Sequence, residues 1–279
     1  MTPIQRHSAV RYVQPLREGG SLPAVVDTED NGLFVVKFRG AGQGARVLIA
    51  ELIVGGLAQR LGLPMPELAL IEISSRFGRS EPDPEIQELL RRSHGTNVGM
   101  RYLAGAFNFD PSAAAELITP ELAARTVWLD ALTTNPDRTP RNPNIMIWQR
   151  GPWLIDHGAA LYAHHDWSSV DEARTRTSFP LIRSHVLLPV AGDLGAADAH
   201  GAGRLSRDTV ADVVATVPDD LLMDPVAGGV EFSSAAEARS RYERYLTERL
   251  AVRRPWLAEA MAAQEQRRIE APQHLKARR

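Results

Sequence analysis

The sequence predicts an α+β fold in which the first third is rich in strands and the remainder is mostly helical. Three observations lead to this prediction. In the first hundred residues, short apolar runs alternate with glycine and asparagine turns. From residue 110 onward, apolar residues recur at helical spacing behind N-cap residues. Inside this helical part, two short apolar runs between residues 145 and 155 predict a single embedded β-hairpin.

The composition sets limits on the class of protein. A chain of 279 residues with 44% hydrophobic residues has enough apolar material for one large domain or two lobes. The net charge of −2 gives no electrostatic reason to expect nucleic acid as a partner. The absence of cysteine excludes disulfides and thiolate chemistry. No apolar run approaches about 18 residues, so we expect no membrane span and a cytoplasmic location.

The first elements are strands around a glycine-rich turn. Partial alternation predicts a strand within residues 1–15. Residues 22–38 read as a hairpin whose turn signal is DTEDNG, from Asp27 to Gly32. Between them stands the turn Gly19-Gly20-Ser21. Its backbone can approach phosphate groups closely, because glycine has no side chain. An ordinary hairpin turn is the simpler interpretation of this motif taken alone.

The only two lysines among the 32 basic residues are Lys37 and Lys276. Lys276 is close to the end of the chain, whereas Lys37 stands in a buried-looking strand, where a compact point charge differs from a planar guanidinium. A solvated edge-strand lysine is the alternative. The next helix, residues 45–61, has a single acid, Glu51, among apolar residues. A solvated glutamate is the usual case for a helix. If Glu51 is buried, its carboxylate is costly without a partner, and pairing with Lys37 removes much of that cost.

The remaining elements follow from periodicity and from glycine, proline and capping residues. Thr119 before Pro120 predicts a helix N-terminus. The sequence predicts a strand at 64–74, a short helix at 86–95, an apolar connection at 97–107 and helices at 110–118 and 119–134. Further on it predicts a loop or short helix at 163–179, an apolar segment at 180–190, a mobile Gly/Ala-rich segment at 191–203, a helix at 206–222 capped by Ser206, and a long helix at 235–268 broken at Pro255.

The stretch 135–161 has the residues best suited to chemistry. Asp137 and Asn142 stand in a D-x-x-x-x-N frame, and Asp156 begins a D-x-G motif after the hairpin. We expect the hairpin to have a four-residue turn at 149–152 and to bring the two loops together, as metal-assisted phosphoryl transfer requires. Asn144 competes with Asn142 as a metal ligand, and spacing favours Asn142. Turn-forming Asp and Asn residues are the structural alternative.

These motifs resemble those of HipA-like kinases, a branch of the protein-kinase-like and phosphatidylinositol-kinase-like fold. The resemblance covers about residues 15–165. It rests on EGGSLPAVV (18–26), VVKF (35–38), LAQRLGLPMPE (57–67), DRTPRNPN (137–144) and LIDHGAAL (154–161). It implies a bilobal fold, with a strand-rich N-terminal lobe at 1–102 and a mostly helical C-terminal lobe at 103–279.

The resemblance also implies an activity and a role for each site residue. The activity is an ATP- and Mg²⁺-dependent transfer of the γ-phosphate to a hydroxyl acceptor, on protein Ser/Thr or on a small molecule. The implied roles are Lys37 on the ATP phosphates, Glu51 as its ion-pair partner, Asp137 as catalytic base, Asn142 and Asp156 as magnesium ligands, and Gly19, Gly20 and Ser21 over the phosphates. Ser21 is, by the same resemblance, a candidate for autophosphorylation.

Two other functions remain open at this point. Thr139 stands where HipA toxins and lipid kinases usually have histidine. This difference motivates a pseudokinase that binds nucleotide and acts through a partner. A metal hydrolase could instead use Asp137, Asp156 and the histidines near them: His157, His164 and His165, with Asp166. Adjacent histidines rarely face one metal, and H-E-x-x-H is absent, so this hypothesis is the weakest.

Overall fold

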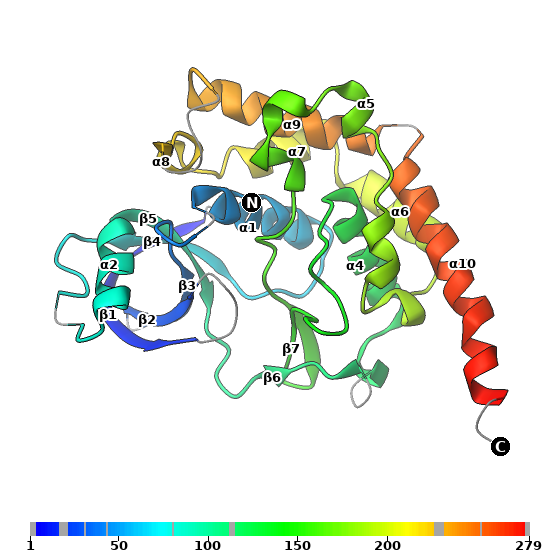
Figure 1. The fold of residues 1–279 in the computed structure, drawn as a ribbon, viewed down its shortest axis with the longest axis horizontal. Coiled ribbons are helices and arrows are strands. Elements are labelled where there is room, and N and C mark those ends of the chain that lie inside the picture. The colour runs from blue at the N-terminus through cyan, green and yellow to red at the C-terminus, as the bar shows by residue number, and fades with distance from the viewer. Residues whose placement is uncertain are drawn as a thin grey trace.

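The computed structural model describes residues 4–16, 22–30, 32–42, 44–79, 81–111, 115–225, 232–251 and 253–276. A strand-rich region is followed by a helical region, which confirms the α+β prediction (Figure 1). The strands are β1 (Gln5–Pro15), β2 (Ala24–Thr28), β3 (Leu33–Lys37), β4 (Leu68–Ile73), β5 (Gly95–Arg101), β6 (Phe107–Asn108), β7 (Ile145–Trp148) and β8 (Gly151–Leu154). The helices are α1 (Ala45–Arg60), α2 (Pro84–Arg92), α4 (Pro120–Leu132), α5 (Glu172–Thr175), α6 (Leu194–Arg204), α7 (Arg207–Val214), α8 (Asp219–Leu222), α9 (Ala235–Leu250) and α10 (Pro255–Lys276).

The N-terminal strands close into a barrel in the order β1-β2-β3-β5-β4. The β2–β3 hairpin is antiparallel, as predicted, with Val25 opposite Val35. Only the β1–β4 pair in this barrel is parallel. Alternate residues of β2 and β3, among them Val26 and Phe34, are fully buried in one apolar cluster, to which Leu90 of α2 also belongs. The barrel therefore has its own core, with α2 packed against it.

Helix α1 lies between the barrel and the helical region (Figure 1). It is buried on all sides, as expected for a central helix with apolar residues around its whole circumference. Its two glycines allow close packing. A Cβ at Gly55 would lie 2.5 Å from Leu68 of β4, and one at Gly56 would lie 2.7 Å from Val213 of α7. The position of Glu51, in the middle of this helix, is therefore fixed from both sides.

The core of the helical region is built around α4. Thr119 caps α4 as predicted, accepting a hydrogen bond from the amide of Leu122. Trp128 of α4 packs edge-to-face on Trp256 of α10, with ring centroids 5.5 Å apart. Gly201 of α6 lies directly against the Trp128 ring. The small residues of 191–203 thus permit close helix packing, and the prediction that this segment is mobile was wrong.

Three other predictions need correction. The β7–β8 turn has two residues rather than four, because Trp148 pairs with Gly151. Gln149 and Arg150 both have positive φ, as in a type I′ hairpin. Residues 95–101 form a barrel strand instead of a connection. The predicted helix at 206–222 is two helices, because Pro218 lacks an amide proton and is the N-cap of α8.

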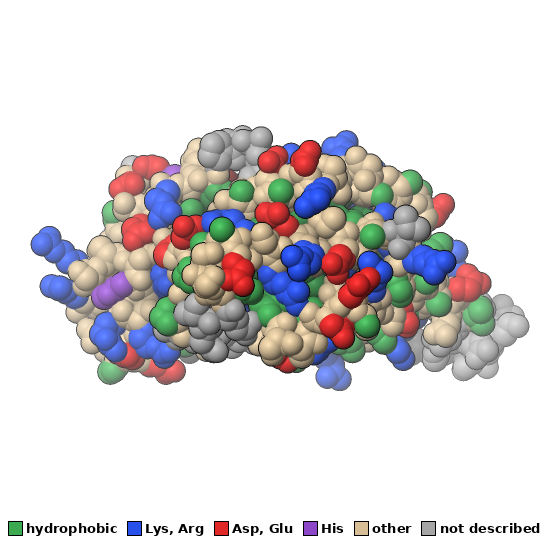
Figure 2. All heavy atoms as spheres, turned by 90° about the horizontal axis from the view of Figure 1, so that it is seen from above, with side chains coloured by type: hydrophobic (Ala, Val, Ile, Leu, Met, Phe, Trp, Pro, Cys, Tyr) green, Lys and Arg blue, Asp and Glu red, His purple; other side chains and the backbone are tan. Residues whose placement is uncertain are grey.

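The distribution of charge and the length of the helices bear on possible partners. Acidic and basic side chains are interspersed over the face drawn in Figure 2. Within the described ranges, no helix is both long and apolar enough to cross a membrane.

Candidate functional site

Lys37, Glu51 and Asp156 meet at one point, although they belong to three separate elements. Lys37 is the last residue of β3, Glu51 lies in the middle of α1, and Asp156 follows β8. The Lys37 ammonium is ion-paired with Glu51, and its Nζ lies 2.5 Å from Asp156 Oδ1. The lysine side chain is 14% exposed and that of Asp156 40% exposed, so the cluster opens toward solvent on the Asp156 side.

Burial and charge have opposing effects on these three groups. Burial lowers the pKa of Lys37, but Glu51 and Asp156 outweigh it and hold the pKa above its ordinary value. Lysine therefore stays charged at neutral pH. Burial would raise the pKa of Asp156, but Lys37 outweighs burial and lowers it. Burial raises the pKa of Glu51, and Lys37 opposes that rise. Glu51 Oε1 also accepts a hydrogen bond from the amide of His157 at 2.9 Å.

The D-x-G motif has a specific packing role. Asp156 has a φ of 54°, a left-handed conformation that turns the chain directly after β8. Its Oδ1 accepts the amide of Gly158 at 3.3 Å. A Cβ on Gly158 would lie 2.5 Å from Cγ1 of Val47 on α1 and 3.3 Å from the Nζ of Lys37. Only glycine lets this loop approach α1 closely enough for Asp156 to reach the lysine.

The loop after α4 presents Asp137 with two asparagines around it. Asp137 Oδ2 accepts hydrogen bonds from Nδ2 of Asn142 at 2.8 Å and from Nδ2 of Asn144 at 3.3 Å. Thr139 and Asn142 exchange two backbone hydrogen bonds, of 3.0 and 3.1 Å. This tight turn brings the side chain of Asn142 back to Asp137, five residues earlier in the sequence. The side-chain hydroxyl of Thr139 accepts a further bond from the amide of Asn142.

The oxygen donors of the site fit magnesium shared with phosphates. The amides of Asn142 and Asn144 use nitrogen to bind Asp137, which leaves each amide oxygen for a cation, and Asn142 is the more exposed of the two. Among the described residues, Asp156 Oδ2 accepts no hydrogen bond. The same residues contain no cluster of three or more His, Asp or Glu that could hold a metal by themselves. Magnesium commonly takes one or two protein oxygens and completes its shell with phosphate and water.

The hydrolase hypothesis finds no support in this geometry. His164 is fully buried, and its Nδ1 lies 3.1 Å from the hydroxyl of Tyr242 on α9. His157 is fully buried beneath the Asp137 loop, with Nδ1 3.3 Å from Arg138. Burial, aided by the charge of Arg138, lowers the pKa of His157 to about 3. These histidines are therefore interior groups of two different contacts and do not face one metal.

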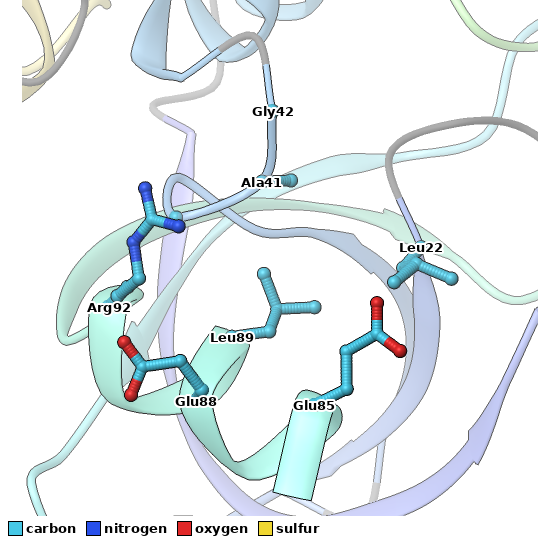
Figure 3. Close-up of a pocket in the computed structure, with 8 residues that line it drawn as sticks. Leu22, Ala41, Gly42, Glu85, Glu88, Leu89 and Arg92 are labelled. Carbon is cyan, nitrogen blue, oxygen red and sulfur yellow. The ribbon is translucent and has the colours of Figure 1, made fainter.

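The predicted turn Gly19-Gly20-Ser21 lies outside the described residues. Near its end, a cavity of about 320 Å³ opens between Leu22, the turn that follows β3, and helix α2 (Figure 3). It is lined by Leu22, Gly40, Ala41, Gly42, Glu85, Glu88, Leu89 and Arg92. Neither Lys37 nor Asp156 lines it, so this cavity is separate from the polar cluster.

Three residues beneath the Asp137 loop were missed by sequence reasoning: Asp130, Arg138 and His185. All three are buried, and Arg138 and His185 both contact the carboxylate of Asp130. Burial would raise the pKa of Asp130, but Arg138 and His185 outweigh it and hold the pKa well below its ordinary value. An indication was available in the sequence, because Asp130 is an acid within the apolar run VWLDAL, as Glu51 is within its own helix.

A strand lysine paired with a helix glutamate and with the carboxylate of a D-x-G motif is typical of protein kinases. The HipA-like kinase family matches residues 9–175, more than half of the sequence, and the chain belongs to this family. The structure is similar to that of the Helicobacter pylori proinflammatory kinase CtkA. The TM-score is 0.54 at 12% sequence identity, over 95% of this chain and 99% of that chain. At this identity the likeness concerns the fold, which is therefore kinase-like. No curated protein matches the sequence.

Proposed function

We propose that the protein is an ATP- and Mg²⁺-dependent kinase that transfers the γ-phosphate to a hydroxyl group, with protein serine or threonine as the acceptor. The observation that carries this proposal is the Lys37 ammonium held between Glu51 and Asp156. A charged lysine fixed beside a half-exposed carboxylate can hold the nucleotide phosphates, while that carboxylate holds the metal. Membership of the HipA-like kinase family supports the same chemistry.

Each residue has one role in this proposal. Asp137 accepts the proton of the acceptor hydroxyl while the hydroxyl oxygen bonds to the γ-phosphorus. The bond between the γ-phosphorus and the β,γ-bridging oxygen breaks, which releases ADP. Lys37 orients the phosphates, and Glu51 holds Lys37. Asn142 and Asp156 hold Mg²⁺, which when bound neutralises the charge developing on the phosphates. Residues 1–102 and 103–279 then act as two lobes on either side of the nucleotide, with the turn at 19–21 over its phosphates.

Phosphate transfer from labelled ATP tests this proposal. We expect ADP formation by the wild-type chain with magnesium, and a loss of about 100-fold or more in Asp137→Asn, because a general base contributes about that factor. Asp156→Asn should show a similar loss. Arg150→Ala, in the exposed β7–β8 turn, is the matched control and should keep wild-type activity. Undiminished transfer in Asp137→Asn would overturn the assignment of the base.

A pseudokinase is the second candidate, and Thr139 is the observation that favours it. Its hydroxyl accepts a hydrogen bond from the loop backbone, at the position where HipA toxins and lipid kinases usually have an imidazole. Both candidates bind nucleotide, and ligand at about 100 times its Kd adds roughly 2.7 kcal/mol of stability in either case, so phosphate transfer is what separates them. A thermal shift with ATP and magnesium, without ADP formation, would identify the pseudokinase. No shift with any nucleotide would reject both.

A further inference from the structure

The residue directly after the proposed base, Arg138, points into the protein instead of toward solvent. It is 1% exposed. Its Nε donates to Asp130 Oδ2 at 2.6 Å, and its Nη1 donates to the main-chain oxygen of Asn144 at 2.5 Å. A buried guanidinium is costly unless its donors are satisfied. Arg138, near the start of the loop that runs from Asp137 to Asn144, therefore connects the end of that loop to Asp130.

Asp130 holds the other side of the same loop. Its Oδ1 accepts a hydrogen bond from Nδ2 of Asn135 at 3.0 Å. The side-chain oxygen of Asn135 in turn accepts the amide of Asp137 at 3.1 Å. Because α4 ends at Leu132, Asp130 belongs to a regular helix packed in the core. The backbone of Asp137 is therefore tied to a rigid element from both directions, through Asn135 before it and through Arg138 after it.

His185 connects a distant segment to this carboxylate. Its Nδ1 accepts the amide of Leu187 at 3.1 Å, so the ring proton is on Nε2, which lies 2.9 Å from Asp130 Oδ2. The amide of Val186 donates to the main-chain oxygen of Arg138 at 2.9 Å. Residues 185–187 thus contact Asp130 through a side chain and the Asp137 loop through the backbone.

We propose that Asp130, Arg138 and His185 form a positioning cluster, which sets the orientation of Asp137 and couples it to the segment 185–187. This inference rests on the proposed function, in which Asp137 is the base. The cluster touches neither acceptor nor nucleotide; it acts through the backbone on both sides of Asp137. Stability alone is a weak explanation for such a cluster, since apolar side chains of similar volume often serve a core equally well.

Substitutions at His185 test this inference, because one removes the hydrogen bond to Asp130 and another restores it. Leucine in His185→Leu cannot donate to Asp130. Glutamine in His185→Gln places an amide nitrogen near the position of Nε2 and restores the donor. We expect His185→Leu to lower kcat about 10- to 100-fold, the effect of losing an outer-shell partner of a site, with KM for ATP within about twofold. His185→Gln should recover most of kcat, and Ser184→Ala, an exposed neighbour, should match the wild type.

Hydrogen–deuterium exchange measures the coupling independently of activity. In His185→Leu, amides of residues 135–144 should exchange faster together with those of 184–190. Faster exchange confined to 184–190, or no change in either segment, would overturn the inference, as would an unchanged kcat. If the wild type transfers no phosphate but both segments respond, the proposed function fails while the coupling stands.

A second substitution covers the case in which His185→Leu does not fold. Asn135→Ala removes a neutral amide and leaves the Asp130–Arg138 ion pair intact. It should lower kcat about 10-fold with unchanged KM for ATP, and it should speed exchange at the Asp137 amide. A wild-type kcat in this variant would show that the link from Asp130 through Asn135 does not position Asp137.

Discussion

Asp156 Oδ1 lies 2.5 Å from the Nζ of Lys37, across a sequence separation of 119 residues, and the same ammonium is ion-paired with Glu51. One lysine therefore connects the last residue of a barrel strand, a central helix and the loop after β8. Asp156 is the more exposed of the two carboxylates and is the one that solvent reaches. Glu51 remains buried and keeps the lysine in place.

Removing Glu51 should take away the buried partner of Lys37 and leave the ammonium with only the half-exposed carboxylate of Asp156. We expect Glu51→Ala to lower the free energy of unfolding by about 3 kcal/mol, because breaking a buried ion pair at one partner is strongly destabilising. Urea unfolding measures this loss. The double variant Lys37→Met/Glu51→Leu should recover much of it, since neither buried charge remains. Additive losses in the double variant would show that the two residues do not stabilise each other.

Gly158 should tolerate no side chain. Its Cβ in Gly158→Ala would lie 2.5 Å from Val47, so the loop must move away from α1, and Asp156 with it. We expect the free energy of unfolding to fall by about 1–3 kcal/mol and the nucleotide-dependent thermal shift to shrink. Gly42→Ala is the matched control, because nothing lies within 4 Å of the added atom. Equal behaviour of the two variants would contradict a packing role for Gly158.

Much of the strand-rich region could be predicted from the sequence, because its cues are local. The hairpin of residues 22–38 and the helix carrying Glu51 are each readable within about twenty residues. The Lys37–Glu51 contact could be inferred because a buried carboxylate needs a partner and the chain has only two lysines. The placement of the turn at 19–21 stays a prediction.

The positioning cluster could not be predicted in the same way. Asp130, Arg138 and His185 come together only after α4, the Asp137 loop and the segment 185–187 have packed. No spacing in the sequence encodes that contact. The helix α6 was missed for a related reason: glycine and alanine indicate mobility locally, but against Trp128 their small size is what allows close packing. Tertiary contacts outweighed local propensity in both cases.

The protein should lose stability as the pH falls below about 6.5, the ordinary histidine value. Burial lowers the pKa of His164 and of His185 in the folded chain. For His185, the carboxylate of Asp130 opposes this lowering of the pKa, and the charge of Arg138 adds to it. The unfolded chain then binds more protons than the folded one, so each histidine can subtract up to about 1.4 kcal/mol per pH unit.

Urea unfolding at about pH 7.5 and about pH 5.5 measures how the free energy of unfolding depends on pH, because this interval spans the ordinary histidine pKa. His185→Gln keeps the donor to Asp130 but cannot titrate, so its stability should depend less on pH than that of the wild type. His94→Gln, at an exposed histidine, should keep the full dependence. A wild-type slope in His185→Gln would show that His185 does not contribute to it.

Two glycines on one helix should respond in opposite directions to the same substitution. In Gly201→Ala the new Cβ would lie 2.5 Å from the Trp128 ring, between α6 and α4, and we expect a loss of about 1–3 kcal/mol in the free energy of unfolding. Gly203, two residues further along α6, has nothing within 4 Å of an added Cβ. Gly203→Ala should therefore stabilise the protein by about 0.5–1 kcal/mol, because alanine loses less backbone entropy than glycine when a helix forms. Thermal unfolding of both variants measures these changes. A higher stability of Gly201→Ala than of the wild type would show that α6 does not pack on Trp128 as described.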